Sequence, residues 1–164
     1  MSRRRRWAVL CVVGLAVAVG LSACTYLFSD APVPTLILGE VMILGGRGEL
    51  MLSVNDMPDG GLASAAVVLG GITYDVGKIS NVTVEALYGF EVLAEQFAGG
   101  LGGFVVAHAC AGLPSGGFVK LHFDVTGNVT LNDFGFTKGD ISLGDDNNDL
   151  IVFEMTDAYK HYAK

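Results

Sequence analysis

Cysteine, tryptophan and basic residues are scarce in this chain of 164 residues. It has three cysteines, one tryptophan, and ten Lys and Arg residues against 17 Asp and Glu residues, for a net charge of −7. Two of the cysteines lie within the first 24 residues, so a domain that starts after them has only Cys110 and forms no internal disulfide. The acidic balance argues against nucleic acid as a partner, because surfaces that bind nucleic acid are basic.

Residue patterns typical of enzymes are also missing. The histidines His108, His122 and His161 show no spacing typical of metal ligands. Ser115 lies in a Gly-Leu-Pro-Ser-Gly turn, which is not the Gly-x-Ser-x-Gly motif of a nucleophilic serine. Cys110 follows small and apolar residues, which favours a buried, inert thiol. The acidic residues form no evident catalytic pair, so the sequence predicts a non-catalytic protein without a required cofactor.

An export signal opens the chain. Arg3–Arg6 precede an uncharged apolar run, Trp7–Gly20. As a helix this run would span about 21 Å at roughly 1.5 Å per residue, which is short of the roughly 30 Å core of a bilayer. The run therefore predicts a secretory signal rather than a spanning helix.

The residues that end this signal, Leu21-Ser22-Ala23-Cys24, resemble the bacterial lipobox. The resemblance implies that residues 1–23 are removed and that Cys24 carries lipid, and an ordinary signal peptide with a chance cysteine is the alternative. Acyl chains contribute about 0.8 kcal/mol per buried CH₂, so they would hold the protein durably on a membrane. Thr25 after the cysteine favours the outer membrane in a diderm bacterium, and a monoderm would display the protein on the outer face of its membrane.

Removal of the signal takes away four of the ten basic residues and leaves a mature net charge of −11. Residues 24–35 form a short tether stiffened by Pro32 and Pro34, and residues 157–164 form a C-terminal tail. Between them, residues 36–156 alternate β-branched runs with glycine pairs, which predicts one all-β sandwich. Alternation within Val119–Val125 places Leu121 and Phe123 on the core side of a strand.

Nine strands are expected in this domain, and Leu87–Gly100 also suits a short helix because its apolar spacing fits either period. The expected strands are Leu36–Leu44, Glu49–Asn55, Ala63–Thr73, Val82–Ala86, Phe90–Ala94, Phe104–Cys110, Phe118–Val125, Val129–Phe136 and Leu150–Met155.

Several motifs of this domain occur in an order that resembles the cohesin domains of cellulosome-type systems. Asn55–Pro58 followed by Gly61–Ala63 looks like the family's turn into its third strand, and Ile72–Asp75 looks like its Tyr-Asp-Pro signature with Val76 in place of the proline. Further matches to the family's strands are Gly39–Val41, Gly48–Val54, Gly103–Ala107 and Gly117–Val125.

The resemblance implies a nine-strand jelly-roll β-sandwich that binds a dockerin-type protein partner, or a polysaccharide, in polysaccharide capture and breakdown. In this family the partner docks on the sheet of strands three, five, six and eight. The corresponding segments here are Ala63–Leu69, Phe90–Ala94, Phe104–Cys110 and Val129–Phe136.

Two other functions remain open. Direct carbohydrate binding usually needs a row of exposed aromatic rings, and the mature chain has no tryptophan and only five tyrosines, Tyr26, Tyr74, Tyr88, Tyr159 and Tyr162. A structural envelope lipoprotein without a ligand is the second alternative.

A cluster of acidic and amide residues lies near the C-terminus. Asp145, Asn147 and Asp149 alternate as the first ligands of many calcium loops do. The rest of such a loop is missing, because Leu150 replaces the glycine and Thr156 the bidentate Glu. The cluster therefore suits either a calcium site or a polar turn.

Overall fold

The computed structural model describes residues 32–108 and 112–157. The chain divides into two units after Pro32, and Val33–Lys164 forms one compact unit. Among the described residues, no helix has the length and apolarity needed to cross a membrane. The predicted signal, the lipidated Cys24, most of the tether, Cys110 and His161 lie outside the described residues, so these expectations stay predictions.

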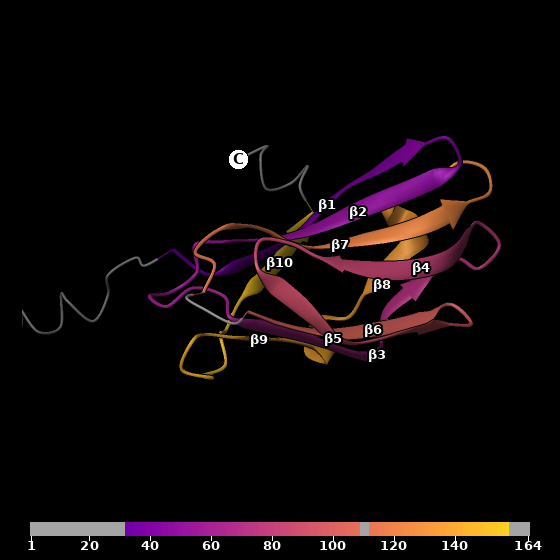
Figure 1. Cartoon of the computed structure of the whole chain (residues 1–164). Helices are drawn as coiled ribbons and strands as arrows, with labels where there is room; N and C mark the ends of the chain where they lie inside the picture. Colours follow the sequence, from indigo (N-terminus) through magenta and orange to yellow (C-terminus); the bar gives the residue numbers. More distant parts are fainter. Residues whose placement is uncertain (1–31, 109–111, 158–164) are drawn as a thin grey trace, which may run out of the picture. The chain divides into compact units, whose positions relative to one another are not determined.

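Ten strands and two short 3₁₀ turns make up the described domain (Figure 1). The elements are β1 (Thr35–Leu44), β2 (Arg47–Asn55), β3 (Ser64–Tyr74), β4 (Ile79–Ala86), β5 (Phe90–Ala98), β6 (Leu101–His108), β7 (Gly116–Val125), η1 (Leu131–Asp133), β8 (Phe134–Phe136), η2 (Lys138–Asp140), β9 (Ile141–Gly144) and β10 (Glu154–Asp157).

The strands form two sheets that face each other. Sheet I has the order β10-β1-β2-β7-β4, and sheet II has the order β5-β6-β3-β8 with β9 also paired to β3. Among the described strands only the β1–β10 pair is parallel, and the other pairs are antiparallel. Figure 1 shows the two layers, with β3, β5 and β6 below and β1, β2 and β7 above. The predicted all-β sandwich is confirmed.

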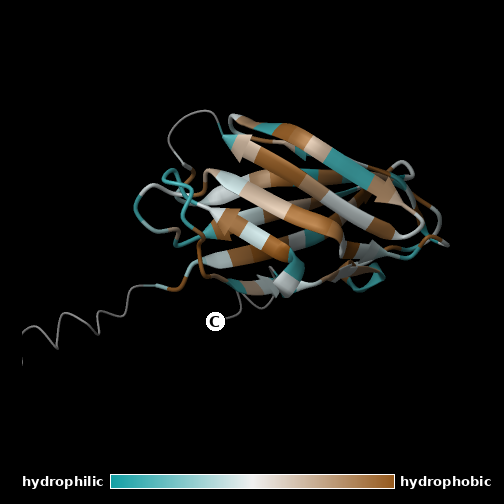
Figure 2. Cartoon of the chain, turned by 90° about the horizontal axis from the view of Figure 1, so that it is seen from below, coloured by the Kyte–Doolittle hydropathy of each residue, from teal (hydrophilic) through white to brown (hydrophobic). Residues whose placement is uncertain are grey.

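Buried apolar residues from both sheets form one core between them. Figure 2 shows hydrophobic and more hydrophilic residues following one another along the strands. On β7, Leu121 and Phe123 are fully or almost fully buried, as their alternation predicts. Phe123 meets Phe134 of sheet II edge to face, with ring centroids 5.0 Å apart. The core therefore joins the sheets directly, which is what holds a two-layer fold together.

The structure corrects three details of the predicted strands. There are ten strands in the described residues rather than nine, because Ile141–Gly144 forms β9. Only Phe134–Phe136 of the predicted eighth strand pairs as a strand, since a 3₁₀ turn precedes it. The predicted last strand shifts to Glu154–Asp157, where it pairs with the start of β1.

The segment that suits either period, Leu87–Gly100, contains strand β5 and no helix. The expected strand Phe90–Ala94 is confirmed and continues to Ala98, because β6 pairs with it on both sides of a bulge at Leu93. Its Glu95 carboxylate accepts a hydrogen bond of 2.7 Å from the backbone N–H of Val84, on the edge strand of sheet I. Glu95 thus covers an edge donor that would otherwise be available for further strand pairing.

Two carboxylates tie loops and strands together and should make stability depend on acid pH. Lys78 lies 2.6 Å from Asp133 and lowers the pKa of that carboxyl, and a 2.8 Å hydrogen bond from the Thr130 N–H acts in the same direction. The hydrogen bond from His122 similarly lowers the pKa of Glu85. Because both pKa values are depressed in the folded state, the stabilisation is present above the usual carboxyl pKa values and is lost as pH falls through the lower, folded ones.

We therefore expect the melting temperature to fall as pH drops below about 4.5, the usual pKa of Glu. Asp133→Asn should keep the hydrogen bond from the Thr130 backbone N–H, because an amide oxygen can also accept it. The melting temperature of this variant should depend less on acid pH, because the titrating carboxyl group is gone. Thermal melts between about pH 3 and pH 7 measure the effect. Asp59→Asn, on an exposed turn, is the control. An identical acid profile for Asp133→Asn and the unchanged protein would rule out this role for the Lys78 pair.

Candidate binding face

The outer surface of sheet II is built from small and aliphatic side chains. Phe104 and Val106 of β6 point into the core, so Val105 between them points outward. Val105 pairs with Ala66 of β3 and Ala94 of β5, which places the three side chains side by side on this surface. We call this surface the binding face, and its residues are Ser64, Ala66, Val68, Leu69, Glu91, Ala94, Gln96, Gly103, Val105, Ala107 and Ser142.

Strand β3 is interrupted in the middle of the binding face. Its register with β6 jumps from Val67↔Phe104 to Ile72↔Gly102, so Val68–Gly71 lie opposite Gly103 alone. The neighbouring chain is interrupted at the same level, because β9 pairs with β3 before the bulge and β8 pairs with β3 after it. The excursion leaves Val68 57% and Leu69 51% exposed, so an apolar ridge stands on an otherwise flat sheet.

A shallow hollow of about 370 Å³ lies beside this ridge. Gly103 forms part of its floor, Val68 and Leu69 one side, and Ala94 and Gln96 the other. Gly103 is required there, since a Cβ at this position would lie 2.6 Å from the Val67 carbonyl oxygen and 2.8 Å from the Leu69 nitrogen. The close approach of β3 to β6 and the hollow therefore depend on the same glycine.

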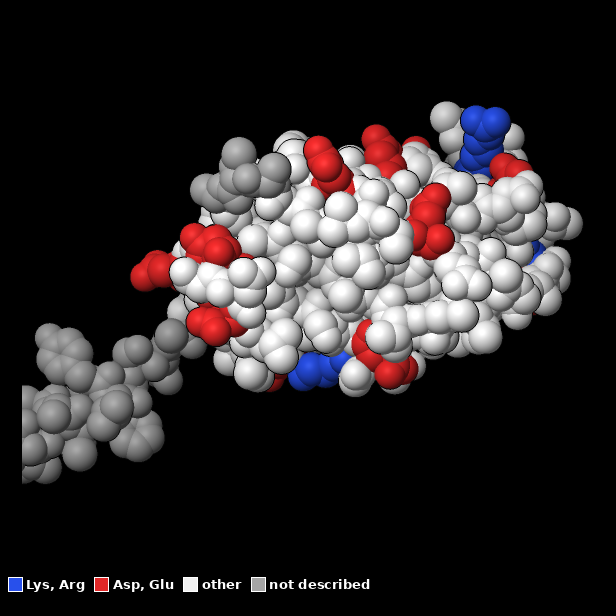
Figure 3. All heavy atoms as spheres, turned by 60° about the horizontal axis from the view of Figure 1, so that its bottom comes forward, with Lys and Arg blue, Asp and Glu red and all other residues white. Residues whose placement is uncertain are grey.

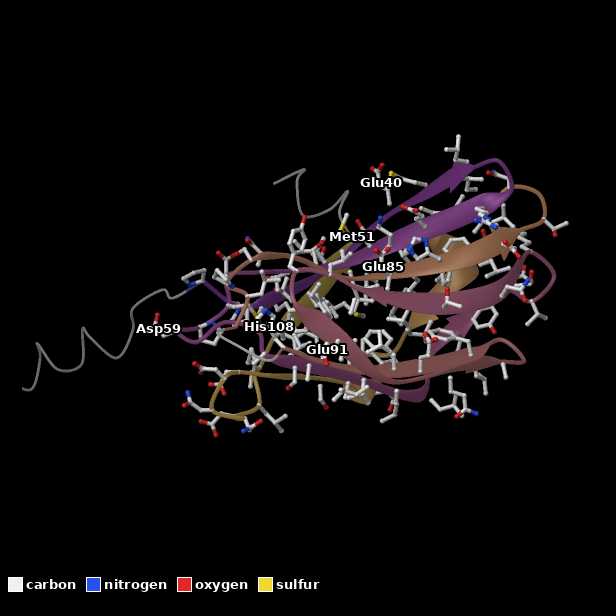
Figure 4. All side chains as sticks on the ribbon, viewed as in Figure 1. Glu40, Met51, Asp59, Glu85, Glu91 and His108 are labelled. Carbon is white, nitrogen blue, oxygen red and sulfur yellow. The ribbon has the colours of Figure 1, made fainter. Side chains whose placement is uncertain are left out.

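The binding face carries little charge. Among its residues, the one ionisable side chain is Glu91, which lies on β5 at the lower sheet (Figure 4). Figure 3, in which sheet II comes forward, shows a largely uncharged surface with carboxylates toward its margins. A flat, apolar and nearly uncharged surface is the composition found at the centre of protein–protein interfaces.

The outer surface of sheet I differs sharply, because charged side chains link its strands. Lys120 lies 3.1 Å from Glu49, and the two ring nitrogens of His122 lie 3.4 Å from Glu49 and 2.6 Å from Glu85. Both ring nitrogens of His122 thus face carboxylates. This charged surface is a natural internal control for the binding face.

His108 ends strand β6 at one end of the binding face. Its Nε2 atom lies 3.0 Å from the Tyr88 carbonyl oxygen, and its ring meets Phe90 edge to face with centroids 5.0 Å apart. Gly89 fits beneath it at φ +87°, where a Cβ would lie 2.7 Å from His108 Nε2. His108 therefore packs against the β4–β5 turn (Figure 4).

The acidic loop 145–149 folds around one carboxylate. Asp145 Oδ1 accepts hydrogen bonds from the backbone N–H groups of Asn147 and Asp149, at 2.9 and 2.8 Å. Asp146 lies beside Gly60 of the loop that contains Asp59, so two acidic turns share one end of the domain. Within residues 32–108 and 112–157, no group of three or more His, Cys, Asp or Glu side chains is arranged to hold a metal. The calcium site at Asp145, Asn147 and Asp149 stays a prediction.

The chain matches no family model and no curated protein sequence. Its fold is similar to solved cohesin modules. The sixth cohesin of scaffoldin B from Acetivibrio cellulolyticus, solved in complex with a mutant Cel5 dockerin, has a TM-score of 0.54 at 15% identity and covers 74% of this chain and 94% of its own. The seventh ScaB type I cohesin of Pseudobacteroides cellulosolvens has a TM-score of 0.55 at 16% identity, over 77% of this chain and 88% of its own.

A third similar structure is the cohesin module of a family 33 glycoside hydrolase from Clostridium perfringens, with a TM-score of 0.52 at 13% identity over 74% of this chain and 98% of its own. These similarities confirm the expected cohesin-like fold. Sequence identities this low indicate a shared fold but do not establish a shared function.

Strands from all four segments expected from the resemblance meet in one sheet, since β3, β5, β6 and β8 belong to sheet II. Of Val129–Phe136 only Phe134–Phe136 takes part, and residues 109 and 110 lie outside the described residues. What the sequence did not indicate is β9 and the ridge at Val68 and Leu69. The glycine pair Gly70–Gly71 is the feature of the sequence that could have predicted the ridge, because glycines inside a strand often mark a bulge.

Proposed function

We propose that this chain is a non-catalytic interaction module that binds a dockerin-type protein partner through the binding face. The observation that carries the proposal is the contrast between the two outer surfaces, one apolar and nearly uncharged and the other covered by a charged network. The similarity in fold to cohesin modules, one of them solved with a dockerin, supports the same conclusion.

The partner should present an apolar and flat surface. Small side chains such as Ala66, Ala94 and Ala107 let a partner's backbone come close, while Leu69 can enter a depression on the partner. An interface of standard size covers about 800 Å² on each side, and the hollow over Gly103 would accept one aliphatic side chain at its centre. Glu91 lies at the margin of the binding face and favours a basic residue at the facing position of the partner. Charge pairs at the rim of an interface contribute more to specificity than to affinity.

Direct polysaccharide binding is the second candidate and is less favoured. Sugar rings stack on exposed aromatic side chains, and the residues of the binding face include none. Tyr88, 74% exposed, lies in the β4–β5 turn and is a single ring rather than a row. Polysaccharide binding is therefore tested beside protein capture in the experiment below.

The experiment is capture from the culture medium of the source organism with the immobilised domain Val33–Lys164, which forms a compact unit with its own core. We expect a secreted protein with a dockerin-type module to be retained, and mass spectrometry would identify it. Insoluble polysaccharides are tested in parallel. Retention of polysaccharide without any protein would favour the second candidate, and retention of neither would contradict both.

We further propose that Cys24 anchors the module at the cell envelope, in a process of polysaccharide capture and breakdown. The lipobox-like sequence Leu21-Ser22-Ala23-Cys24 supports the anchor. Inhibition of lipoprotein signal peptidase should make the unprocessed form accumulate, and Cys24→Ala should release the protein from the membrane fraction. Cys110→Ala is the matched control, because it removes a cysteine outside the signal. Membrane retention and normal processing of Cys24→Ala would refute the anchor.

A further inference from the structure

The second half of strand β1 is an open sheet edge within residues 32–108 and 112–157. Strand β10 pairs only with Thr35–Leu38, and β2 lies on the other side of β1. A bulge follows at once, where Gly39 and Glu40 together lie opposite Met51. From Val41 to Leu44 no described residue pairs with the outer edge of β1.

This edge presents hydrogen-bonding groups in a regular register, and none of them pairs with another strand of the described residues. Gly45 and Gly46 form a two-residue turn with φ values of +62° and +82°, the type that joins adjacent strands tightly. In such a hairpin the residues that flank the turn, Leu44 and Arg47, form a hydrogen-bonded pair. Because bonding alternates along antiparallel strands, Val41 and Ile43 direct their N–H and C=O groups away from β2, toward the open edge.

The edge is also unusually apolar. Leu44 is 88%, Met42 56% and Ile43 41% exposed, in a run of three consecutive residues. They border a largely apolar groove of about 340 Å³, closed by Arg47 and Glu49 of β2. Natural edge strands are usually protected from further pairing by a lysine, a proline or a covering segment. Residues 41–46 contain no lysine and no proline.

We propose that this edge binds the same edge of a second copy of the chain, as an antiparallel strand pair around a two-fold axis. Val41 of one copy then exchanges hydrogen bonds with Ile43 of the other, and Met42 lies beside its own equivalent on the axis. This pairing joins sheet I of the two copies into one continuous sheet and covers the apolar run on both. It uses sheet I and leaves the binding face on sheet II open.

Charge complementarity favours a second copy. In this register Glu40 of one copy lies opposite Leu44 of the other, and Leu44 is paired with Arg47 on β2. The Glu40 carboxylate of each copy therefore lies on the side of the Arg47 guanidinium of the other copy. The two-fold axis makes two such pairs in the dimer. Met42 on the axis meets an identical apolar side chain, so no like charges oppose each other.

The test is the mass of the domain Val33–Lys164 in solution, by analytical ultracentrifugation over a range of concentrations. We expect a dimer in equilibrium with the monomer. Because residue 42 lies beside itself on the axis, Met42→Lys alone and Met42→Glu alone should each give a monomer through like-charge repulsion. A mixture of the two variants should form a heterodimer. Val152→Lys, at a site 84% exposed elsewhere on the domain, should leave the dimer unchanged.

Several results would overturn the proposal. These are a monomer at all concentrations, a dimer that survives Met42→Lys, or a charge-swapped mixture that stays monomeric. A variant that ends at Asp157 tests residues 158–164 as the alternative occupant of this edge. If only that shortened variant dimerises, the chain's own C-terminal residues cover the edge and the proposal is wrong. Equal far-UV spectra and melting temperatures would exclude unfolding as the cause of any change.

Discussion

Val105→Arg is expected to weaken partner binding by about a hundredfold or more. Val105 lies at the centre of the binding face, between Ala66 and Ala94 and beside the hollow over Gly103. A guanidinium there would be buried against an apolar partner without a counter-charge, and an unpaired charge buried at an interface costs about 2–5 kcal/mol. A loss of about 3 kcal/mol corresponds to a factor of roughly 100 in Kd.

Thr83→Arg is the matched control for this variant. Thr83 is also a β-branched residue within a strand, but it lies exposed on the outer side of sheet I. The Thr83→Arg variant should bind the captured partner as tightly as the unchanged domain does. The melting temperatures of both variants should lie within a few degrees of that of the unchanged domain, since neither substitution replaces a core residue. Titration calorimetry with the purified partner measures the difference. Equal loss in both variants would indicate a general effect of added charge and not a contact on sheet II.

Phe123→Ala is expected to cost about 3–5 kcal/mol of folding free energy, the usual range for loss of a buried aromatic residue. The Phe123 side chain is 2% exposed, and its ring joins β7 of sheet I to Phe134 of sheet II. Gly48 packs directly on the same ring, because a Cβ there would collide with it. The truncation therefore leaves a cavity between the sheets that the rigid strands cannot easily close.

The cost would be a large part of the total stability of such a domain, which is typically about 5–15 kcal/mol. Urea unfolding of the Val33–Lys164 domain measures it as a shift of the midpoint. Val152→Ala should change the midpoint little, since Val152 is 84% exposed. A shift below about 1 kcal/mol for Phe123→Ala would mean that the two sheets do not depend on this contact.

The sequence predicted most of the fold, because strand alternation is a local property. Leu121 and Phe123 face the core as their period of two requires. The resemblance to cohesin domains, and not the residue pattern, implied which strands share a sheet, and β3, β5, β6 and β8 do belong to sheet II. The sequence left a choice or erred where pairing partners, and not local preference, decide the structure. Phe90–Ala98 is a strand and not a helix because β6 lies beside it, and the unpredicted strand Ile141–Gly144 forms because β3 does.

The candidate site was predicted only as a set of strands. Its ridge depends on a register jump between β3 and β6, and register is a long-range property that one strand's sequence does not specify. The same holds for the open edge of β1, which exists because the pairing of β10 ends at Leu38. Both features became visible only when strands distant in sequence were placed side by side.

Chemical-shift mapping of the isotope-labelled Val33–Lys164 domain with its captured partner tests the central claim most directly. We expect the largest shifts at four residues of the binding face and small shifts at three residues of the opposite sheet. The first are Ala66, Leu69, Ala94 and Val105, and the second are Glu49, Lys120 and His122. Shifts concentrated on β2, β7 and β4, with the binding face unchanged, would contradict it.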